Sequence, residues 1–233
     1  MLGTILPTTV LISRPFEDAN AVKRAVLAQF PSVDVIVAPA LKIKNVPFEA
    51  PEGDFDALVL TSKHAVEAAA RIAPNATALC VGDATAKTAR AHGLKAISAQ
   101  GAAQDLFELA RDSDVKKLLY LHGAHVHTDL AGALTNAGLE AKSRVVYRQD
   151  ACAFSAEVRD RVAKLKSLVV PVYSARSAQI VSENLNGFGG QIVLVAISDA
   201  AQQGWSGPDP KTTIIAQAPN SKAMLTAIAS QLT

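Results

Sequence analysis

The sequence contains few aromatic side chains and few cysteines. Aromatic residues make up 5% of the 233 residues, so alanine and aliphatic side chains must fill the cores that a 49% hydrophobic content allows. The two cysteines, Cys80 and Cys152, lack the spacing of a metal or redox motif, which is typical of a protein in a reducing cytosol.

Long hydrophobic runs are also absent. The longest one, Ile192–Ile197, is far shorter than the ~20 residues that a transmembrane helix needs. The start of the chain, Met1–Pro7, has neither the basic region nor the apolar stretch of an export signal. The sequence therefore predicts no membrane partner and a cytoplasmic location.

An excess of charge of one sign and the common nucleotide motifs are missing too. The net charge is +2 and no block of lysines or arginines occurs, so no nucleic-acid partner is expected. A phosphate-binding loop, a G-x-G-x-x-G fingerprint and a nucleophile elbow are all lacking. Nucleotide-dependent kinases and reductases, and triad hydrolases, therefore lack their signatures here.

The second half of the chain repeats the first, weakly but in register. Ser13-Arg14-Pro15 and His122-Gly123 each follow an apolar run, and Val37 and Val146 lie at equal distances beyond them. Further along, Thr61–Val66 corresponds to Tyr173–Ala178, Cys80–Thr85 to Ala196–Ala201, and Ile97–Gln100 to Ile214–Gln217. Two copies are too few for a solenoid, so they predict two similar lobes. A small-molecule site is then expected in the cleft that two lobes form.

Short β-branched runs alternate with amphipathic stretches, which predicts an α/β fold with parallel sheets. Gly93 and Gly138 lie where we expect helices to end, and Pro15 suits a first helical turn. The expected strands are Thr9–Ile12, Val33–Val37, Ala57–Leu60, Ala78–Val81, Lys95–Ile97, Leu118–Leu121, Ser143–Tyr147, Leu168–Tyr173, Ile192–Ile197 and Thr213–Ile215.

The repeat allows two assemblies. Each copy could fold by itself, with one connection near Arg111–Lys116. Alternatively, the first strand–helix–strand segment packs with the last two units of the chain, and the middle of the chain forms an inserted lobe. The second assembly needs two crossings, near Ala38–Leu41 and near Val146–Gln149. Periodicity does not distinguish them.

Small or hydroxyl-bearing residues follow several expected strands at the starts of helices. The carboxyl edge of a parallel sheet is where open α/β folds bind ligands, and helix N-termini there favour carboxylates or phosphates. Any one of these residues, taken alone, is more simply a helix cap. Their recurrence on both lobes favours a ligand site. The residues are Thr61, Ser62, Gly82, Thr85, Ser174 and Ser198.

Three histidines, His122, His125 and His127, invite interpretation as a metal site. Their spacing puts no more than two on one helical face, and no cysteine accompanies them, so a solvated loop is the favoured interpretation. Three acids, Glu17, Asp18 and Asp129, are placed to favour the first turns of their helices.

Tyr147 ends a strand at an expected lobe boundary. It could be a buried packing residue, or its phenol could face a cleft and donate a proton. The sequence leaves both interpretations open.

The order and spacing of these motifs resemble the uroporphyrinogen-III synthase family over nearly the whole chain. The family's motifs correspond here to Ser13-Arg14-Pro15, Thr61–Val66, Val81–Ala86, Gly123 with Leu130, Val145-Val146-Tyr147 and Ser174–Ala178. The resemblance implies two similar flavodoxin-like or Rossmann-like α/β lobes with parallel sheets, joined by a two-stranded linker. It selects the inserted assembly, with residues 1–38 and 150–233 in one discontinuous lobe, residues 42–145 in the other, and linker strands at 38–42 and 145–150.

The resemblance also implies the activity. The substrate would be hydroxymethylbilane, a linear tetrapyrrole that the family closes to uroporphyrinogen III while inverting the last pyrrole ring and losing water. Tyr147 would assist departure of the hydroxyl group. Substrate carboxylates would be bound by Arg14, Ser62, Lys63, Gly82, Thr85, Arg148, Ser174, Arg176 and Ser198.

The resemblance implies no cofactor and no metal. It suggests a monomer with a transient contact to the preceding enzyme of the pathway. Two departures from the family pattern concern the C-terminal lobe: Ser198-Asp199-Ala200-Ala201 replaces a motif with glycine and threonine, and Ala175 replaces a proline. Because Asp199 is unfavourable for an anionic ligand, the alternative is a divergent, non-catalytic two-lobe binder of an acidic small molecule.

Overall fold

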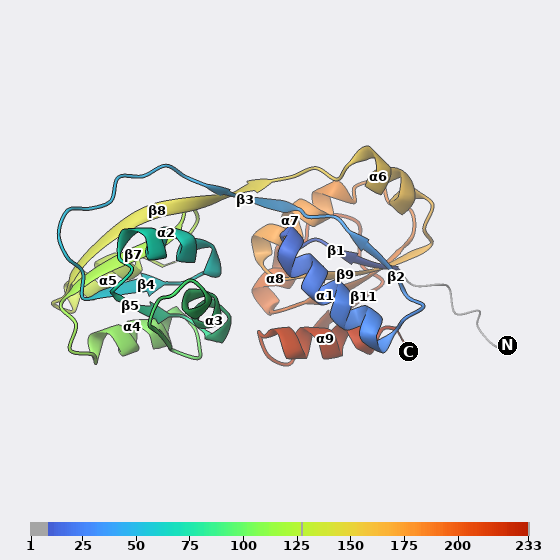
Figure 1. Cartoon of the computed structure of the whole chain (residues 1–233). Helices are drawn as coiled ribbons and strands as arrows, with labels where there is room; N and C mark the ends of the chain where they lie inside the picture. Colours follow the sequence, from blue (N-terminus) through green and yellow to red (C-terminus); the bar gives the residue numbers. More distant parts are fainter. Residues whose placement is uncertain (1–8, 127, 233) are drawn as a thin grey trace. The chain divides into compact units, whose positions relative to one another are not determined.

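The computed structural model describes residues 9–126 and 128–232, so Met1–Pro7 and His127 lie outside the described residues. Its strands and helices alternate along most of the chain (Figure 1). In order they are β1 (Thr9–Ile12), α1 (Phe16–Gln29), β2 (Asp34–Val37), β3 (Leu41–Asn45), β4 (Ala57–Leu60), the 3-10 helix η1 (Lys63–Ala65), α2 (Val66–Ile72), β5 (Thr77–Cys80), α3 (Asp83–Ala91), β6 (Ala96–Ser98), α4 (Ala103–Arg111), β7 (Lys117–Gly123), α5 (Leu130–Asn136), β8 (Glu140–Ala151), α6 (Ala156–Ala163), β9 (Ser167–Val172), α7 (Ala175–Asn184), β10 (Gln191–Ala196), α8 (Asp199–Gln203), β11 (Thr212–Ile215) and α9 (Ser221–Ala229). Within the described ranges, no helix is both long enough and apolar enough to cross a bilayer.

The chain divides into two compact units. Unit 1 comprises the chain up to Lys42 and from Asp150 onward, and unit 2 comprises Ile43–Gln149. The sheet of unit 1 has the order β11-β10-β9-β1-β2, and the second sheet has the order β3-β8-β7-β4-β5-β6. The pairings along β11-β10-β9-β1-β2 and β8-β7-β4-β5-β6 are parallel. The predicted α/β fold class is confirmed, with two mostly parallel sheets.

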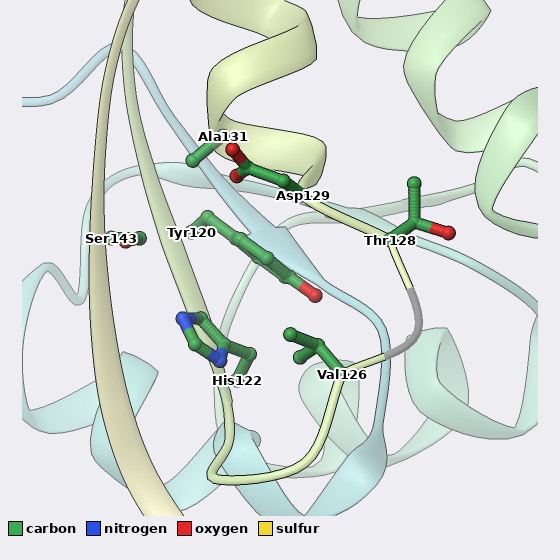
Figure 2. Close-up of a pocket in the computed structure, with 7 residues that line it drawn as sticks. All are labelled: Tyr120, His122, Val126, Thr128, Asp129, Ala131 and Ser143. Atoms are coloured by element: carbon green, nitrogen blue, oxygen red, sulfur yellow. The ribbon is translucent and has the colours of Figure 1, made fainter.

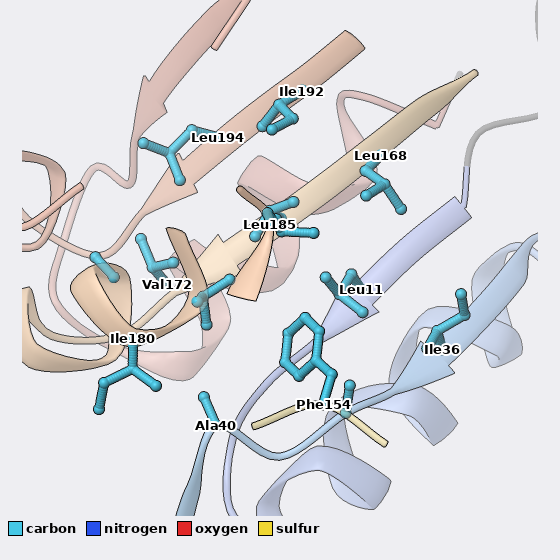
Figure 3. Packing of buried hydrophobic residues seen from close by; sticks show 14 of the residues in the cluster. Leu11, Ile36, Ala40, Phe154, Leu168, Val172, Ile180, Leu185, Ile192 and Leu194 are labelled. Carbon is cyan, nitrogen blue, oxygen red and sulfur yellow. The ribbon is translucent and has the colours of Figure 1, made fainter. Parts of the chain in front are cut away.

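Helices cover both faces of the sheet in unit 1. One face packs Leu11, Leu168 and Leu194 against α6, α7 and α8, together with Phe154 (Figure 3). The other face packs Val10 and Ile12 against α1 and α9. Strands buried on both faces are expected to be aliphatic throughout, and the four residues of β1 are all buried.

Unit 2 repeats this arrangement. One face of its sheet packs Leu58, Leu60 and Leu121 against η1, α2 and α3. The opposite face packs Val59 and Tyr120 against α4 and α5. The two units therefore have corresponding strand orders and corresponding helix layers. The sequence repeat reflects this structural similarity.

Two strands, β3 and β8, carry the chain across the boundary between the units. The Cys152 amide donates to the Ala40 carbonyl at 2.8 Å and the Val46 amide to the Val146 carbonyl at 3.0 Å. Because residue numbers rise on one strand as they fall on the other, β3 and β8 run antiparallel. The first segment, β1–α1–β2, forms its sheet with β9, β10 and β11 from the end of the chain.

The strands predicted from the sequence are all present, and most of their observed ends lie within two residues of the predicted ends. The exception is Ser143–Tyr147, which is only the middle of β8, Glu140–Ala151. Strand β3 was not among the predicted strands. The glycine positions are as expected: α3 and α5 end just before Gly93 and Gly138, which adopt positive φ values of 84° and 91°.

Candidate functional site

Tyr147 lies at the last rung of the β7–β8 ladder, directly after a bulge. His122 pairs with Val145, but the next residue, Gly123, pairs with Tyr147, so Val146 is an extra residue on β8. Side chains alternate along a strand, which would put Tyr147 on the same face as Val145. The extra residue moves the Tyr147 side chain to the opposite face. Tyr147 therefore packs on the face of the sheet that carries η1 and α2.

The Tyr147 ring is closely confined in that position. A Cβ atom on Gly123 would lie 2.7 Å from Cζ and Cε2 of Tyr147 and 2.9 Å from its hydroxyl oxygen, so only glycine allows the ring to lie there. The ring of His64 lies 5.6 Å away, centroid to centroid, at an interplanar angle of 60°. Tyr147 is 6% exposed.

Burial raises the pKa of Tyr147, and a hydrogen bond with the Ser62 side chain opposes this rise. The phenol is therefore protonated at neutral pH and can act as a proton donor. It lies beside Ser62, which the sequence had placed in the site independently.

A second tyrosine, Tyr120 on β7, lies on the opposite face of the same sheet. Its hydroxyl is 3.2 Å from the Thr61 hydroxyl at the end of β4. Its ring stacks on His122 with centroids 4.5 Å apart. Burial raises the pKa of Tyr120, while the bond with Thr61 lowers it. Tyr120 thus contacts the residue before Ser62.

The predicted site residues of unit 2 lie at the carboxyl edge of β4 and β5. Ser62 precedes η1, and its hydroxyl accepts from the His64 amide at 3.3 Å, while Lys63 begins η1. Gly82 precedes α3. Thr85 is 6% exposed, and its amide donates to the Gly82 carbonyl at 3.1 Å. The first amides of a helix lack partners within it, so this edge presents N–H donors, although the Thr85 amide is already bonded.

In unit 1 the corresponding edge carries Arg14, Ser174, Arg176 and Ser198. Ser174 caps α7 by accepting from the Ser177 amide at 3.1 Å, and Ser198 caps α8 by accepting from the Ala201 amide at 3.3 Å. Arg176 lies in the first turn of α7 and is half-buried. The serines therefore do act as helix caps. The first amides of α7 and α8 take no part in these cap bonds.

Arg14 is held in place by two groups. Its guanidinium donates to the Asp18 carboxylate at 3.1 Å and lies 4.3 Å from the centre of the Tyr173 ring. Burial raises the pKa of Tyr173, and the nearby Arg14 charge opposes the rise. Asp18 lies in the first turn of α1, as predicted, and its carboxylate also orients Arg14. Arg148 follows Tyr147 on β8 and is exposed.

The histidines do not form a metal site among the residues that the structure describes. The loop predicted for them is wrong for His122, which is the last residue but one of β7. The ladder with Val145 and the stack on Tyr120 extend the strand to this residue. His125 is exposed beyond the strand. Asp129 caps α5 by accepting from the Gly132 amide at 2.9 Å, as its predicted place at a helix start requires.

Neither Tyr120 of unit 2 nor Tyr173 of unit 1 was predicted from the sequence as a residue near a site. Tyr120 belongs to an aliphatic strand, Leu118–Leu121, where it has the pattern of a core residue. Tyr173 follows β9 and corresponds to Thr61 in the sequence repeat. That correspondence was the signal that could have identified it.

Comparison with known families identifies the family to which this chain belongs. A sequence model of the family described as uroporphyrinogen-III synthase HemD matches residues 25–226. The chain belongs to the uroporphyrinogen-III synthase family. Its enzyme class is therefore that of a cyclising lyase of tetrapyrrole biosynthesis, as the motif resemblance implied. A search of curated proteins found no match to this sequence.

Solved structures agree on the fold of this uroporphyrinogen-III synthase family member. A uroporphyrinogen-III synthetase from Helicobacter pylori matches with a TM-score of 0.65 and 18% identity, over 97% of this chain and 99% of that one. A mutant uroporphyrinogen III synthase from the extremely thermophilic bacterium Thermus thermophilus matches with a TM-score of 0.53 and 16% identity, over 97% and 98% of the two chains. At such identities the likeness concerns the fold alone.

Proposed function

We propose that this chain closes hydroxymethylbilane to uroporphyrinogen III and that Tyr147 is the proton donor of the reaction. The observation that carries the assignment of Tyr147 is its confinement: the phenol is buried, bonded to Ser62 and held against Gly123. A protonated phenol in a fixed position suits general acid catalysis.

The first step is loss of the hydroxyl group from the first ring. The C–O bond breaks as the pyrrole nitrogen supplies electrons, and the oxygen leaves as water with the proton of Tyr147. The product is an electron-poor azafulvenium cation, which keeps its N–H proton. The phenolate recovers a proton when the last ring returns to its aromatic state.

Ring inversion follows from the point of attack. The last ring attacks the azafulvene carbon through its already substituted position, which gives a spirocyclic intermediate. In that intermediate the bond between the attacking ring carbon and its original methylene bridge breaks, and this bridge bonds to the free α carbon on the other side of the ring nitrogen, so the ring is inverted. The substrate supplies its own electrons throughout, and the protein contributes chiefly by holding one folded conformation.

The carboxylate arms need several separate binding groups. Amides at the helix starts provide neutral donors with a favourable dipole, and arginine side chains provide charged ones. The proposed binding residues are Arg14, Ser62, Lys63, Gly82, Thr85, Arg148, Ser174, Arg176 and Ser198. The fixed guanidinium of Arg14, between Asp18 and Tyr173, supports its inclusion.

The test of Tyr147 is the variant Tyr147→Phe, assayed with freshly prepared hydroxymethylbilane and analysis of the isomers formed. We expect formation of uroporphyrinogen III to slow by about 100-fold, the usual scale of a general acid. Urea unfolding should show a folded protein. Wild-type turnover in a folded Tyr147→Phe variant would remove Tyr147 from the mechanism, and a wild-type chain that yields only the non-inverted isomer would favour the non-catalytic binder.

We further propose that the enzyme works as a cytoplasmic monomer. Two free cysteines, Cys80 and Cys152, suit a reducing compartment. A transient contact with the enzyme that supplies hydroxymethylbilane would shorten the time in which this substrate closes without inversion. Sedimentation of the purified chain, alone and with that enzyme, tests both statements.

A further inference from the structure

Unit 2 contains a cavity whose residues have no part in the mechanism above. It has a volume of about 380 Å³ and is lined by Tyr120, His122, Val126, Thr128, Asp129, Ala131 and Ser143. Figure 2 shows Tyr120 and His122 extending from β7 beside this space, with Asp129 and Ala131 on the α5 side and Ser143 on β8. The volume lies at the lower end of the ~300–1,000 Å³ typical of ligand pockets, so it suits one small ring rather than four.

One wall of the cavity is formed by a pair of aromatic rings. Tyr120 and His122 stack with an interplanar angle of 29°. The His122 Nδ1 atom lies 2.8 Å from the Gly123 carbonyl oxygen, which can only accept, so Nδ1 carries a proton. In the neutral imidazole the other nitrogen, Nε2, is then a hydrogen-bond acceptor. This wall offers stacking area and an acceptor.

The charged group of the cavity is the carboxylate of Asp129. Its Oδ1 atom accepts from the Gly132 amide at 2.9 Å, and a carboxylate has about four lone-pair positions, so it can accept further bonds. A carboxylate beside the cavity disfavours an anionic group and favours an N–H donor. Val126 and Ala131 add apolar contacts on the remaining sides.

The cavity also adjoins the edge that carries the proposed chemistry. Tyr120 lines it and lies 3.2 Å, hydroxyl to hydroxyl, from Thr61, the residue before Ser62. We propose that this cavity is a subsite for one pyrrole ring of the tetrapyrrole, packed against the aromatic pair of Tyr120 and His122 with its N–H donated to Asp129. The inference rests on the proposed function, because the pyrrole is that of its substrate.

The assignment separates two kinds of recognition in one substrate. One pyrrole ring, with its single N–H donor, is bound by a cavity that offers acceptors, whereas the carboxylates of the substrate are bound by N–H donors at helix starts. Asp129 would repel a carboxylate arm that entered in place of the ring, so the cavity also selects the orientation of that ring.

The experiment follows the imidazole signals of the full-length protein by NMR. The chain has five histidines, and the variant His122→Gln identifies the signal of His122. Two probes are titrated: a monopyrrole with one acetate and one propionate arm and no amine, and adipate, a dicarboxylate without a ring. The monopyrrole should shift the His122 signal saturably in the millimolar range, and adipate should not.

Two variants test the geometry. Asp129→Asn keeps a good helix cap but removes the charge, and it should weaken monopyrrole binding at least about tenfold, as for a lost hydrogen bond to a charged acceptor. The matched control Asp114→Asn changes an exposed aspartate elsewhere in unit 2 and should bind as the wild type does. Ala131→Leu fills the cavity and should abolish the His122 shift.

Three results would overturn the subsite: no shift of His122, an equal shift with adipate, or unchanged binding in Asp129→Asn. Any of these, in a protein that still makes uroporphyrinogen III, rejects the subsite and leaves the proposed function intact. If instead the wild-type chain makes only the non-inverted isomer, the proposed function fails, whatever the monopyrrole does.

Discussion

The substitution Gly123→Ala tests whether the position of the Tyr147 ring matters. The added Cβ would lie 2.7 Å from two ring carbons, whereas ordinary contacts begin near 3.4 Å. The two residues are partners in the β7–β8 ladder, so the backbones are fixed and the ring has to move. The difference between 3.4 and 2.7 Å, about 0.7 Å, is the least displacement that relieves the contact.

The expected effects on stability and on catalysis differ in size. Overpacking in a core costs about 1–3 kcal/mol, which unit 2 should tolerate while remaining folded. Misplacement of a reacting group by about 1 Å can cost about 100-fold in rate. A shift of about 0.7 Å should therefore lower kcat by about tenfold or more, and it also disturbs the bond to Ser62.

The assay combines isomer analysis with a double-mutant comparison. Gly123→Ala is measured in the wild-type background and in Tyr147→Phe, beside Gly189→Ala as a control. A methyl group on Gly189, which belongs to unit 1, would meet no other atom within 4 Å, so this substitution should leave kcat unchanged. If Gly123 acts through Tyr147, its substitution should have little further effect once the phenol is gone.

Full kcat in a folded Gly123→Ala variant would refute this reasoning, because the phenol would then work from a displaced position. An equal loss of kcat in the wild-type and Tyr147→Phe backgrounds would also refute the reasoning. Such a loss would show that Gly123 acts on the site by a route that does not include the Tyr147 hydroxyl.

Three other predictions concern protonation and helix capping. Because burial raises the pKa of Tyr147, the phenol stays protonated, and kcat should not fall through its ionisation between about pH 7 and 9, as a pH–rate profile would show. Burial raises the pKa of Cys80 to about 11, so native protein at about pH 8 should be alkylated by iodoacetamide only at the half-buried Cys152, and at both cysteines in urea, as measured by mass. Ser174→Ala removes the bond to the Ser177 amide and should lower the free energy of unfolding by about 1 kcal/mol in urea titrations; an unchanged midpoint would contradict the capping role.

The central strands of the two sheets could be predicted because both of their faces are buried. Leu58, Val59 and Leu60 are fully buried, and such strands appear in the sequence as short aliphatic runs. The fold class and the family followed from these runs and from the motifs that follow them. The two assemblies of the repeat could not be separated by periodicity, since both use the same strands.

Strand β3 was missed because it lies at the edge of its sheet. Its sequence, Leu41 to Asn45, alternates apolar residues with Lys42 and Lys44 within a proline-rich segment. Edge strands are often charged, and charge and proline weaken the usual strand signal. The alternation was the signal that could have found it.

The surroundings of Tyr147 could not be predicted from its own strand. Alternation puts its side chain on the face of Val145, and only the bulge against His122 and Gly123 moves it to the other face. A bulge depends on the partner strand, which is separated from Tyr147 by a helix. The residues that bind the carboxylates remain predictions, to be tested by substitution.

The order of the strands has a consequence for synthesis on the ribosome. Strand β1 emerges first, but its partner β9 lies more than half the chain away, so its sheet has to wait for Ser167–Val172. All the strands of β8-β7-β4-β5-β6 are translated before α6 begins. Domains tend to fold as their last strand leaves the exit tunnel. Unit 2 should thus complete its fold before unit 1 does, with β1 and α1 exposed to chaperones in the meantime.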